Sequence, residues 1–256
     1  MPSAKVNFPI SFHIGSTSIS LHTVLEAAAF FTGFRYFIYL RKKQGDLYSS
    51  SSRISVIIGA IIGALLGSRL VGLLERPYEL AQAASPLTYI LSNKTVVGGF
   101  LGGLAGVELT KKLMGETKAS GDLFVFPMIL ALIIGRLGCF TMGIYEETYG
   151  TASSLPWAMD LGDGLKRHPV TLYEIFYLFV TWTALALAKN KLQLRAGALF
   201  KLFMILYLAF RLLLDLIKPH YELAAGLSAI QLACAGGLLY YSPYILRPKK
   251  LLTIYA

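Results

Sequence analysis

Long apolar runs separated by short polar and charged segments dominate the hydropathy pattern of this chain. A helix needs roughly 20 predominantly apolar residues to cross the hydrocarbon of a bilayer, and seven runs come near that length. The third run is short and rich in glycine, which favours close packing against neighbouring helices. The pattern predicts an all-α, polytopic membrane helix bundle with seven transmembrane helices. The predicted spans are about 21–40, 54–74, 95–110, 123–143, 170–188, 196–217 and 223–246.

Composition supports a membrane protein and excludes several soluble classes. Of the 256 residues, 55% are hydrophobic and only 15% are charged, whereas soluble domains carry about 25% charged residues. The same numbers exclude intrinsic disorder. The net charge of +10 does not indicate a nucleic-acid partner, because the basic residues lie between apolar runs. We expect residues 1–256 to form a single integral-membrane domain, and the first twenty residues lack the pattern of a signal peptide.

The distribution of basic residues predicts the orientation of the chain in the membrane. Cytoplasmic connections carry an excess of Lys and Arg, and one set of connections holds 14 of these residues while the other holds 6. We therefore expect the N-terminus outside and the C-terminus in the cytoplasm. The richer set is Arg41, Lys42, Lys43, Arg53, Lys111, Lys112, Lys118, Lys189, Lys191, Arg195, Lys201, Arg247, Lys249 and Lys250. The poorer set is Lys5, Arg76, Lys94, Lys166, Arg167 and Lys218.

Ionisable residues inside the predicted spans gather near the outer surface. A charge within a span costs several kcal/mol and marks a functional candidate. With the predicted orientation, five spans bring such groups to the outer third of the membrane, and only Arg35 falls in the inner half, where it can extend to the surface. The outer set is His22, Glu26, Arg69, Arg136, Glu174, Arg211 and Asp215.

Two interpretations of this outer set remain open. Arg211 and Asp215 are four residues apart and can form a structural ion pair, and His22 and Glu26 have the same spacing. Three arginines at one depth instead favour an anionic ligand, because guanidinium binds phosphate through two hydrogen bonds and stays charged in a low dielectric. A phospholipid headgroup carries its phosphate at that depth. The outer connection 144–169 would then cover the site.

The two cysteines, Cys139 and Cys234, both lie inside apolar runs, and the four histidines are scattered along the chain. We therefore expect no disulfide framework, no metal site and no cofactor.

Several motifs resemble those of the prolipoprotein diacylglyceryl transferases. The central motif is Gly-Arg-Leu-Gly-Cys-Phe at 135–140, followed by Gly143 and by Tyr149-Gly150. Further motifs occur in the same order as in the family, from about 18 to 235, and together they are fairly specific. They are Ser-Leu-His at 20–22, Gly-Ser-Arg at 67–69, Gly-Gly at 98–99, Leu-Pro-Trp at 155–157, His-Pro-Val-Thr-Leu-Tyr-Glu at 168–174, Phe-Arg at 210–211, Asp215 and Gln231.

The resemblance implies a multi-pass enzyme of the cell inner membrane that works without a cofactor. Such enzymes transfer the diacylglyceryl group of phosphatidylglycerol to the lipobox cysteine of a prolipoprotein, next to its signal peptide, and release glycerol phosphate. By resemblance, Arg136 and Arg211 hold the phosphate, and Asp215 orients Arg211. Other matched positions are expected to bind substrate, with the glycines letting lipid and backbone approach closely. These positions are Arg69, Gly98, Gly99, Gly138, Gly150, His168 and Glu174.

The chain departs from the family pattern where the reaction needs a base. Cys139 stands in place of an asparagine, Val97 in place of a histidine, Val24 in place of a tyrosine, and Ile144 in place of an acidic residue. Two hypotheses follow. Either proton removal from the thiol has moved to another ionisable group, or the chain uses another acceptor. The candidate groups are His22, Glu26, Glu146 and Glu147.

Alternatives to the prolipoprotein transferase are a paralogue that passes a lipid-derived group to a different acceptor and a non-catalytic phospholipid transporter or binding protein. Transporters often contain repeated halves with sites near the midplane of the membrane. This chain shows no internal repeat and gathers its charges near one surface, so we rank transport third.

Overall fold

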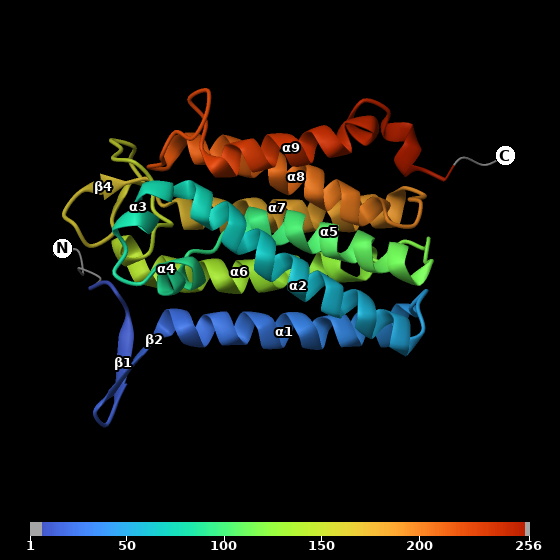
Figure 1. Ribbon diagram of the computed structural model, residues 1–256, viewed down its shortest axis with the longest axis horizontal. Coiled ribbons are helices and arrows are strands. Elements are labelled where there is room, and N and C mark those ends of the chain that lie inside the picture. The colour runs from blue at the N-terminus through green and yellow to red at the C-terminus, as the bar shows by residue number, and fades with distance from the viewer. Residues whose placement is uncertain (1–6, 254–256) are drawn as a thin grey trace. The chain divides into compact units, whose positions relative to one another are not determined.

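The computed structural model describes residues 7–253, so that Lys5 lies outside the described residues. The chain is mostly helical (Figure 1). It forms two compact units, each built from separate stretches of sequence. The first unit contains residues 7–45, 123–192 and 217–219, and the second contains 46–122, 193–216 and 220–253. Each unit is described by itself below.

The first unit begins with a β-hairpin that leads directly into a long helix. Strands β1 (Ser11–Ile14) and β2 (Thr17–Ser20) pair antiparallel, and Gly15 makes the turn between them with a positive φ of 61°. Ser20 then caps helix α1 (Leu21–Gln44), because its hydroxyl accepts a hydrogen bond from the backbone N–H of His22 at 3.2 Å.

Helix α6 (Val125–Met142) forms the centre of the first unit and packs against both α1 and α7 (Val170–Lys191). Gly33 allows α1 to approach closely, since a Cβ there would lie 3.1 Å from the Ala131 Cβ. The 3₁₀ turns η1 (Asp122–Phe124) and η2 (Gly143–Tyr145) flank α6. The connection to α7 contains the short strands β3 (Met159–Asp160) and β4 (Lys166–Arg167).

The second unit is built on helices α2, α5, α8 and α9. Helix α2 packs on α5, and α9 packs on α8, α2 and α5. Short helices α3 and α4 connect α2 to α5, and the turns η3 and η4 follow α8 and α9. The elements are α2 (Ser50–Glu75), α3 (Pro77–Gln82), α4 (Pro86–Ser92), α5 (Val96–Met114), α8 (Ala198–Leu214), η3 (Asp215–Ile217), α9 (Ala229–Ile245) and η4 (Pro248–Leu251).

Glycines hold α2 and α5 in backbone contact. A Cβ built on Gly63 would lie 2.2 Å from the carbonyl oxygen of Gly102, and one built on Gly102 would lie 2.3 Å from that of Gly63. Gly67 and Gly98 face each other in the same way one turn along, as do Gly59 and Gly106. Close packing between backbones replaces the hydrophobic effect as the force that joins helices in lipid. The glycine-rich run predicted from the sequence is thus explained by its contact with α2.

Polar caps fix the ends of the other helices of this unit. The Asp122 carboxylate accepts hydrogen bonds from the backbone N–H groups of Gly197 at 2.6 Å and Phe200 at 2.9 Å, at the start of α8. Ser228 and Gln231 form a reciprocal capping box at the start of α9. This cap explains why α9 begins at Ala229, later than the predicted span start at about 223.

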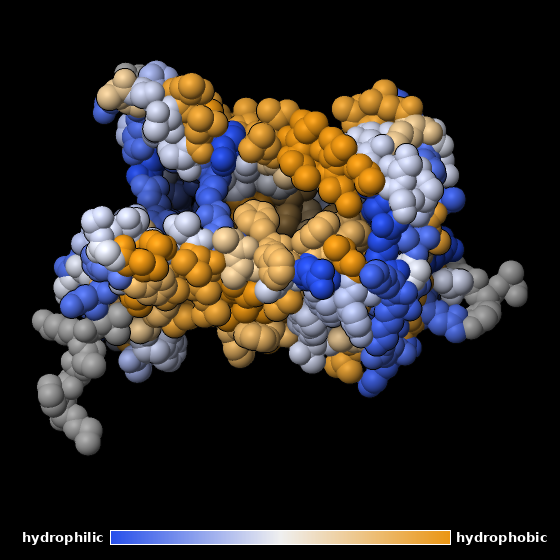
Figure 2. All heavy atoms as spheres, turned by 90° about the horizontal axis from the view of Figure 1, so that it is seen from below, coloured by the Kyte–Doolittle hydropathy of each residue, from blue (hydrophilic) through white to orange (hydrophobic). Residues whose placement is uncertain are grey.

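Each of the seven predicted spans coincides with a helix among the described residues. Three helices, α2, α6 with its flanking turns and α7, are long and apolar enough to cross a membrane, and α4 with α5 forms a fourth candidate bent by 85°. Helices α8 and α9 have only 17 residues each. Large apolar side chains such as Phe30 and Phe31 are exposed on α1, and Figure 2 shows broad hydrophobic areas on this face. The chain is therefore an α-helical protein with three to four candidate membrane spans.

The glycine contact between α2 and α5 yields a stability prediction. Gly63→Ala should lower the free energy of unfolding by about 1–3 kcal/mol, because the new methyl group cannot fit beside the Gly102 backbone. Gly236→Ala in α9 is the matched control, since a Cβ there meets no atom within 4 Å, and it should be neutral or stabilising by up to about 1 kcal/mol. Thermal unfolding in detergent, followed by circular dichroism, compares the two variants. Equal melting temperatures would contradict the proposed contact.

Candidate active site

A buried ion pair between α6 and α7 anchors the candidate site of the first unit. The Arg136 Nε lies 2.8 Å from the Glu174 Oε2, and the two residues are only 8% and 1% exposed. Glu174 lies in the second turn of α7, and Arg136 lies two turns before the end of α6. An arginine this deep requires an anionic neighbour, because removing a charge from water is costly unless it is paired. The pair therefore fixes both the position of the guanidinium and the contact of the two helices.

The thiol of Cys139 lies one helical turn after Arg136 and contacts two charged groups. Its Sγ is 3.6 Å from the Arg136 Nη1 and 3.6 Å from the Glu146 Oε1. The Cys139 residue is buried. The sequence indicates no metal site, yet one ligand atom each of His22, Cys139 and Glu146 lies within 4.8 Å of the others.

His22 stands between two carboxylates. Its Nδ1 is 3.3 Å from the Glu146 Oε2, and its Nε2 is 3.6 Å from the Glu26 Oε2 on the same face of α1. Gly138 makes room for the imidazole, since a Cβ there would lie 3.3 Å from the His22 Nδ1. The structure thus joins the predicted His22–Glu26 face to one of the two loop glutamates. Glu147 is exposed.

A sharp turn after α6 returns Glu146 to the helix end. Gly143 has φ 60° and ψ −127°, and a Cβ there would lie 2.2 Å from the carbonyl oxygen of Leu161. The next residue, Ile144, donates its backbone N–H to that same carbonyl at 3.1 Å. Only glycine fits at this position, both because of its φ and because of the close backbone.

The 144–169 connection is held together beside this turn. The Gly150 N–H donates to the His168 carbonyl at 3.1 Å, and a Cβ at Gly150 would lie 2.5 Å from the His168 Cβ. The Tyr173 hydroxyl lies 3.2 Å from the His168 Nδ1 and accepts a hydrogen bond from the Trp157 indole N–H at 2.8 Å. His168 and Gly150 therefore support the connection, while the exposed Trp157 suits a membrane interface.

An ion pair also braces the tip of this connection. The Arg167 Nη2 lies 2.6 Å from the Asp163 Oδ2, and the guanidinium stacks over the Tyr149 ring at 5.1 Å. The hydrogen bond from Arg167 holds the pKa of Asp163 below its usual value, and the same bond raises the pKa of Arg167. Both charges are therefore retained at neutral pH.

The second unit contains the other predicted phosphate ligand, Arg211, in a buried polar region. Arg211 and Asp215 are 5% and 1% exposed. The Ser228 hydroxyl donates to the Asp215 carboxylate, and Ser228 in turn belongs to the cap of α9. The Glu75 carboxylate accepts from the Ile230 N–H at 3.0 Å at the same helix start. Sequence inspection missed the roles of Ser228 and Glu75, although the Ser-x-x-Gln spacing at 228–231 is the pattern of a capping box.

The remaining predicted substrate-binding residues of the second unit lie on α2 and α5. The Arg69 Nε is buried and makes no hydrogen bond with another described residue. Gly98 is occupied by the contact with α2, where a Cβ would lie 2.3 Å from the Gly67 carbonyl oxygen, whereas a Cβ at Gly99 would make only ordinary contacts. Gly98 is therefore required by helix packing, and Arg69 keeps an unused donor.

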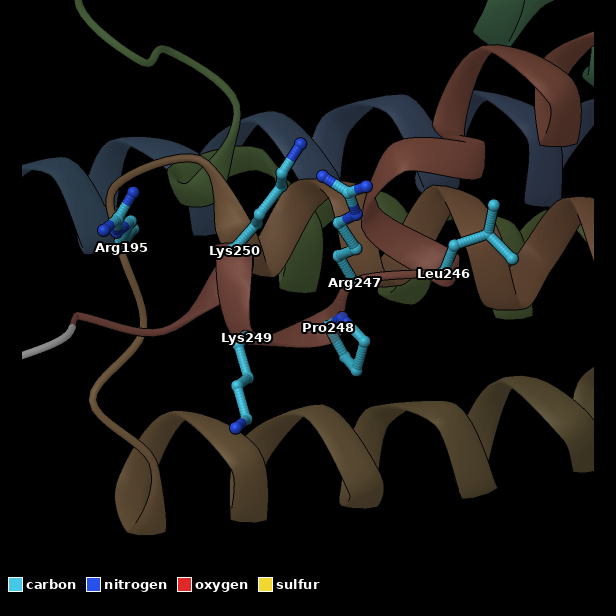
Figure 3. Close-up of a pocket in the computed structure, with 6 residues that line it drawn as sticks. All are labelled: Arg195, Leu246, Arg247, Pro248, Lys249 and Lys250. Atoms are coloured by element: carbon cyan, nitrogen blue, oxygen red, sulfur yellow. The ribbon is translucent and has the colours of Figure 1, made fainter.

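A cavity of about 470 Å³ lies at the other end of α9, away from Arg211. Figure 3 shows that Lys249 points to the opposite side from Arg247 and Lys250, so the cations do not converge on one ligand. The basic residues of this cavity belong to the set of Lys and Arg that is predicted to face the cytoplasm. The lining residues are Arg195, Leu246, Arg247, Pro248, Lys249 and Lys250.

Comparison with known proteins identifies the family. The family model of the prolipoprotein diacylglyceryl transferases matches residues 9–245, which is most of the chain. The chain belongs to this family. Proteins named phosphatidylglycerol–prolipoprotein diacylglyceryl transferase are similar to it in several bacteria. The Bordetella parapertussis protein is 36% identical over 158 residues, which is 55% of this chain, and the chain spans 59% of that relative. The Methylobacillus flagellatus protein is 28% identical over 229 residues, covering 82% of this chain and 83% of the relative.

Two of the motifs that resemble those of the family meet at the candidate site. The motif at 135–140 of this diacylglyceryl transferase family member supplies Arg136 and Cys139, and the motif at 168–174 supplies Glu174, so that two distant motifs meet in one buried contact. The acidic residue expected after Gly143 is replaced by Ile144, yet Glu146 reaches the Cys139 thiol.

The Arg136–Glu174 pair yields a second stability prediction. Glu174→Gln should lower the free energy of unfolding by about 3–5 kcal/mol, because it leaves the buried guanidinium beside a neutral amide. Glu79→Gln is the matched control: Glu79 pairs with Arg76 at 3.1 Å on a half-exposed surface, and its loss should cost at most about 1 kcal/mol. Thermal unfolding in detergent measures both. A Glu174→Gln protein as stable as the control would show that the pair does not hold α6 to α7.

Proposed function

We propose that this chain transfers a diacylglyceryl group from phosphatidylglycerol to the lipobox cysteine of a prolipoprotein. In the reaction, the cysteine sulfur attacks the terminal glyceryl carbon that carries the phosphate. A carbon–sulfur bond forms, the carbon–oxygen bond breaks, and glycerol phosphate leaves with the bonding electrons. The observation that carries the proposal is the buried Arg136, held by Glu174 beside an imidazole and a carboxylate, in a member of the diacylglyceryl transferase family.

Phosphate binding is the role that we assign to the arginines. The leaving phosphate gains negative charge as the carbon–oxygen bond breaks, and a guanidinium fixed in advance stabilises that charge. Arg136 is fixed by Glu174, and Asp215, bonded to Ser228, is a positioning residue for Arg211. Arg69 offers a buried N–H donor for the same class of ligand. Gly99, Gly138, Gly150 and His168 would shape the lipid and peptide surfaces.

Proton removal from the incoming thiol is the second requirement. A thiol with a pKa near 8.5 is only a few per cent thiolate at neutral pH. We propose that the group formed by His22, Glu26 and Glu146 takes over this work from the family residues that are absent here. The distances of 3.3 and 3.6 Å around His22 support a connected set of proton acceptors.

Membrane placement follows from the same proposal. We propose seven transmembrane helices in the cell inner membrane, with the N-terminus outside and the C-terminus in the cytoplasm. The support is the correspondence of seven helices with seven apolar runs and the 14-to-6 division of basic residues. The anionic phospholipid and the signal-peptide region of the prolipoprotein would then reach the site from the outer leaflet.

The phosphate role predicts a loss of transferase activity in arginine variants. Arg136→Gln and Arg211→Gln should each lower kcat about 100-fold or more, because each removes a preorganised donor to the developing charge. The assay follows transfer from labelled phosphatidylglycerol vesicles to a lipobox peptide. Arg35→Gln is the matched control, since Arg35 is exposed on α1, and it should keep full activity.

Complementation of a strain depleted of its lipoprotein transferase tests the acceptor separately. Growth rescue by the wild-type chain and none by Arg136→Gln is expected. Labelled lipid consumed without transfer to the peptide would favour the paralogue with another acceptor. Lipid movement between vesicles without any bond cleavage would favour the non-catalytic transporter or binding protein.

The proton-acceptor role predicts a different set of variants. His22→Ala, Glu26→Gln and Glu146→Gln should each slow transfer while phosphatidylglycerol binding is retained, because the phosphate ligands are untouched. His13→Ala and Glu222→Gln, both at exposed positions, are matched controls and should behave as the wild type. Normal turnover in all three site variants would reject the proposal and indicate that the acceptor arrives already ionised.

A further inference from the structure

We propose that His22, Cys139 and Glu146 form a zinc-binding site in the first unit. This zinc site uses one imidazole nitrogen, one thiolate sulfur and one carboxylate oxygen, which are all ligands that Zn²⁺ accepts. The three side chains come from α1, from α6 and from the residue that follows η2. The catalytic role of this zinc rests on the proposed function, whereas the binding site itself rests on the positions of the three side chains.

The separations of the ligand atoms match those around a tetrahedral zinc ion. With bond lengths of about 2.0–2.1 Å to nitrogen or oxygen and about 2.3 Å to sulfur, tetrahedral ligands lie about 3.3 Å apart for nitrogen and oxygen and about 3.6 Å apart for sulfur and oxygen. The His22 Nδ1 lies 3.3 Å from the Glu146 Oε2, and the Cys139 Sγ lies 3.6 Å from the Glu146 Oε1. The two distances end on different oxygens of the Glu146 carboxylate, one facing the imidazole and the other facing the thiol. The carboxylate would bind the ion through either oxygen.

Two of the atoms that would bind the metal make no hydrogen bond in the described part of the chain. The His22 Nδ1 and the Glu146 Oε2 are both buried, and neither makes a hydrogen bond within residues 7–253 despite their closeness. Buried polar atoms are normally satisfied, and an exception requires an explanation such as a bound ion. A cation between the two lone pairs supplies it, whereas direct hydrogen bonding between them does not.

The surroundings of the cluster also suit a divalent cation. The His22 Nε2 lies 3.6 Å from the Glu26 Oε2, and metal-bound histidines usually turn their second nitrogen toward a carboxylate that fixes the ring. Arg136 is beside the thiol but already paired with Glu174. Glu146 and a zinc-bound Cys139 thiolate would supply two negative charges, which Zn²⁺ offsets.

Three protein ligands leave a fourth position open, as in catalytic zinc sites. A lipobox thiol that binds there loses its proton, because a zinc-bound thiol is deprotonated, and the proton passes to solvent. The bound sulfur then attacks the glyceryl carbon, the carbon–oxygen bond breaks, and glycerol phosphate leaves. The metal is neither oxidised nor reduced. Bound zinc would then be the means by which the His22, Glu26 and Glu146 group promotes removal of the thiol proton. Two of its ligands, Cys139 and Glu146, lie where the chain departs from the family pattern.

The site is tested by metal content and by the spectrum of bound Co²⁺. The purified full chain should hold about one Zn²⁺, and exchange for Co²⁺ should give the intense visible bands of tetrahedral cobalt and a thiolate-to-cobalt charge-transfer band. Cys139→Ser should abolish the charge-transfer band. Cys234→Ser, which removes the second of the two cysteines, is the matched control and should leave the spectrum unchanged. Glu26→Gln should weaken Zn²⁺ affinity about 10- to 100-fold by releasing the imidazole.

The outcomes separate this inference from the proposed function. A chain that binds no Zn²⁺ or Co²⁺, or whose cobalt spectrum survives Cys139→Ser, overturns the zinc site even where transferase activity is present. A chain that binds zinc through Cys139 but transfers no lipid keeps the site and overturns the proposed function. Where Cys139→Ser fails to fold, the wild-type and Cys234→Ser spectra still decide which cysteine binds the metal.

Discussion

The cost of holding a guanidinium among apolar helices governs the first unit. Arg136 is almost fully buried in α6, and it is tolerable there because the Glu174 carboxylate on α7 lies 2.8 Å from its Nε. The same contact aims the opposite edge of the guanidinium, Nη1, at the Cys139 thiol. One electrostatic requirement therefore joins two helices and orients the Arg136 guanidinium toward the Cys139 thiol.

The second unit differs from the first, because its helices α2 and α5 are held together by backbone contacts at glycines. Its principal contact, α2 with α5, depends on backbone approach at glycines such as Gly63 and Gly102, with no charge involved. Its buried charges, Arg211 and Asp215, lie at the end of α8, where the hydroxyl of Ser228 satisfies Asp215. Close packing of glycines determines how α2 and α5 are arranged. A separate polar network, in which Ser228 bonds Asp215, fixes the buried charges at the end of α8. A substitution at the glycines should therefore affect folding, and one at Arg211 should affect the proposed transfer reaction.

Much of this fold could be predicted from hydropathy, because apolar runs of membrane-spanning length leave helices as the only way to satisfy the backbone. Each predicted run became a helix. The hairpin at 11–20 and the short helices α3 and α4 were not predicted, since their sequences are too short for a periodic signal. The Arg136–Glu174 contact could not be predicted as a pair, although both members were singled out by the cost of burying them. The contact of His22 with Glu146 had no sequence signal at all, because it depends on how α1 packs on α6.

The turn at Gly143 shows how the chain can change its signature residues and keep an acid at the site. The sequence has Ile144 where the family has an acidic residue, and by spacing alone Glu146 is too far along. Gly143, with φ 60°, begins the 3₁₀ turn η2, and this turn shortens the path so that the Glu146 carboxylate returns to within 3.6 Å of Cys139. The carboxylate meets a cysteine there in place of the asparagine, so the two departures are in direct contact. Because they touch, the two departures are not independent of each other: together they place a thiol and a carboxylate in contact beside His22.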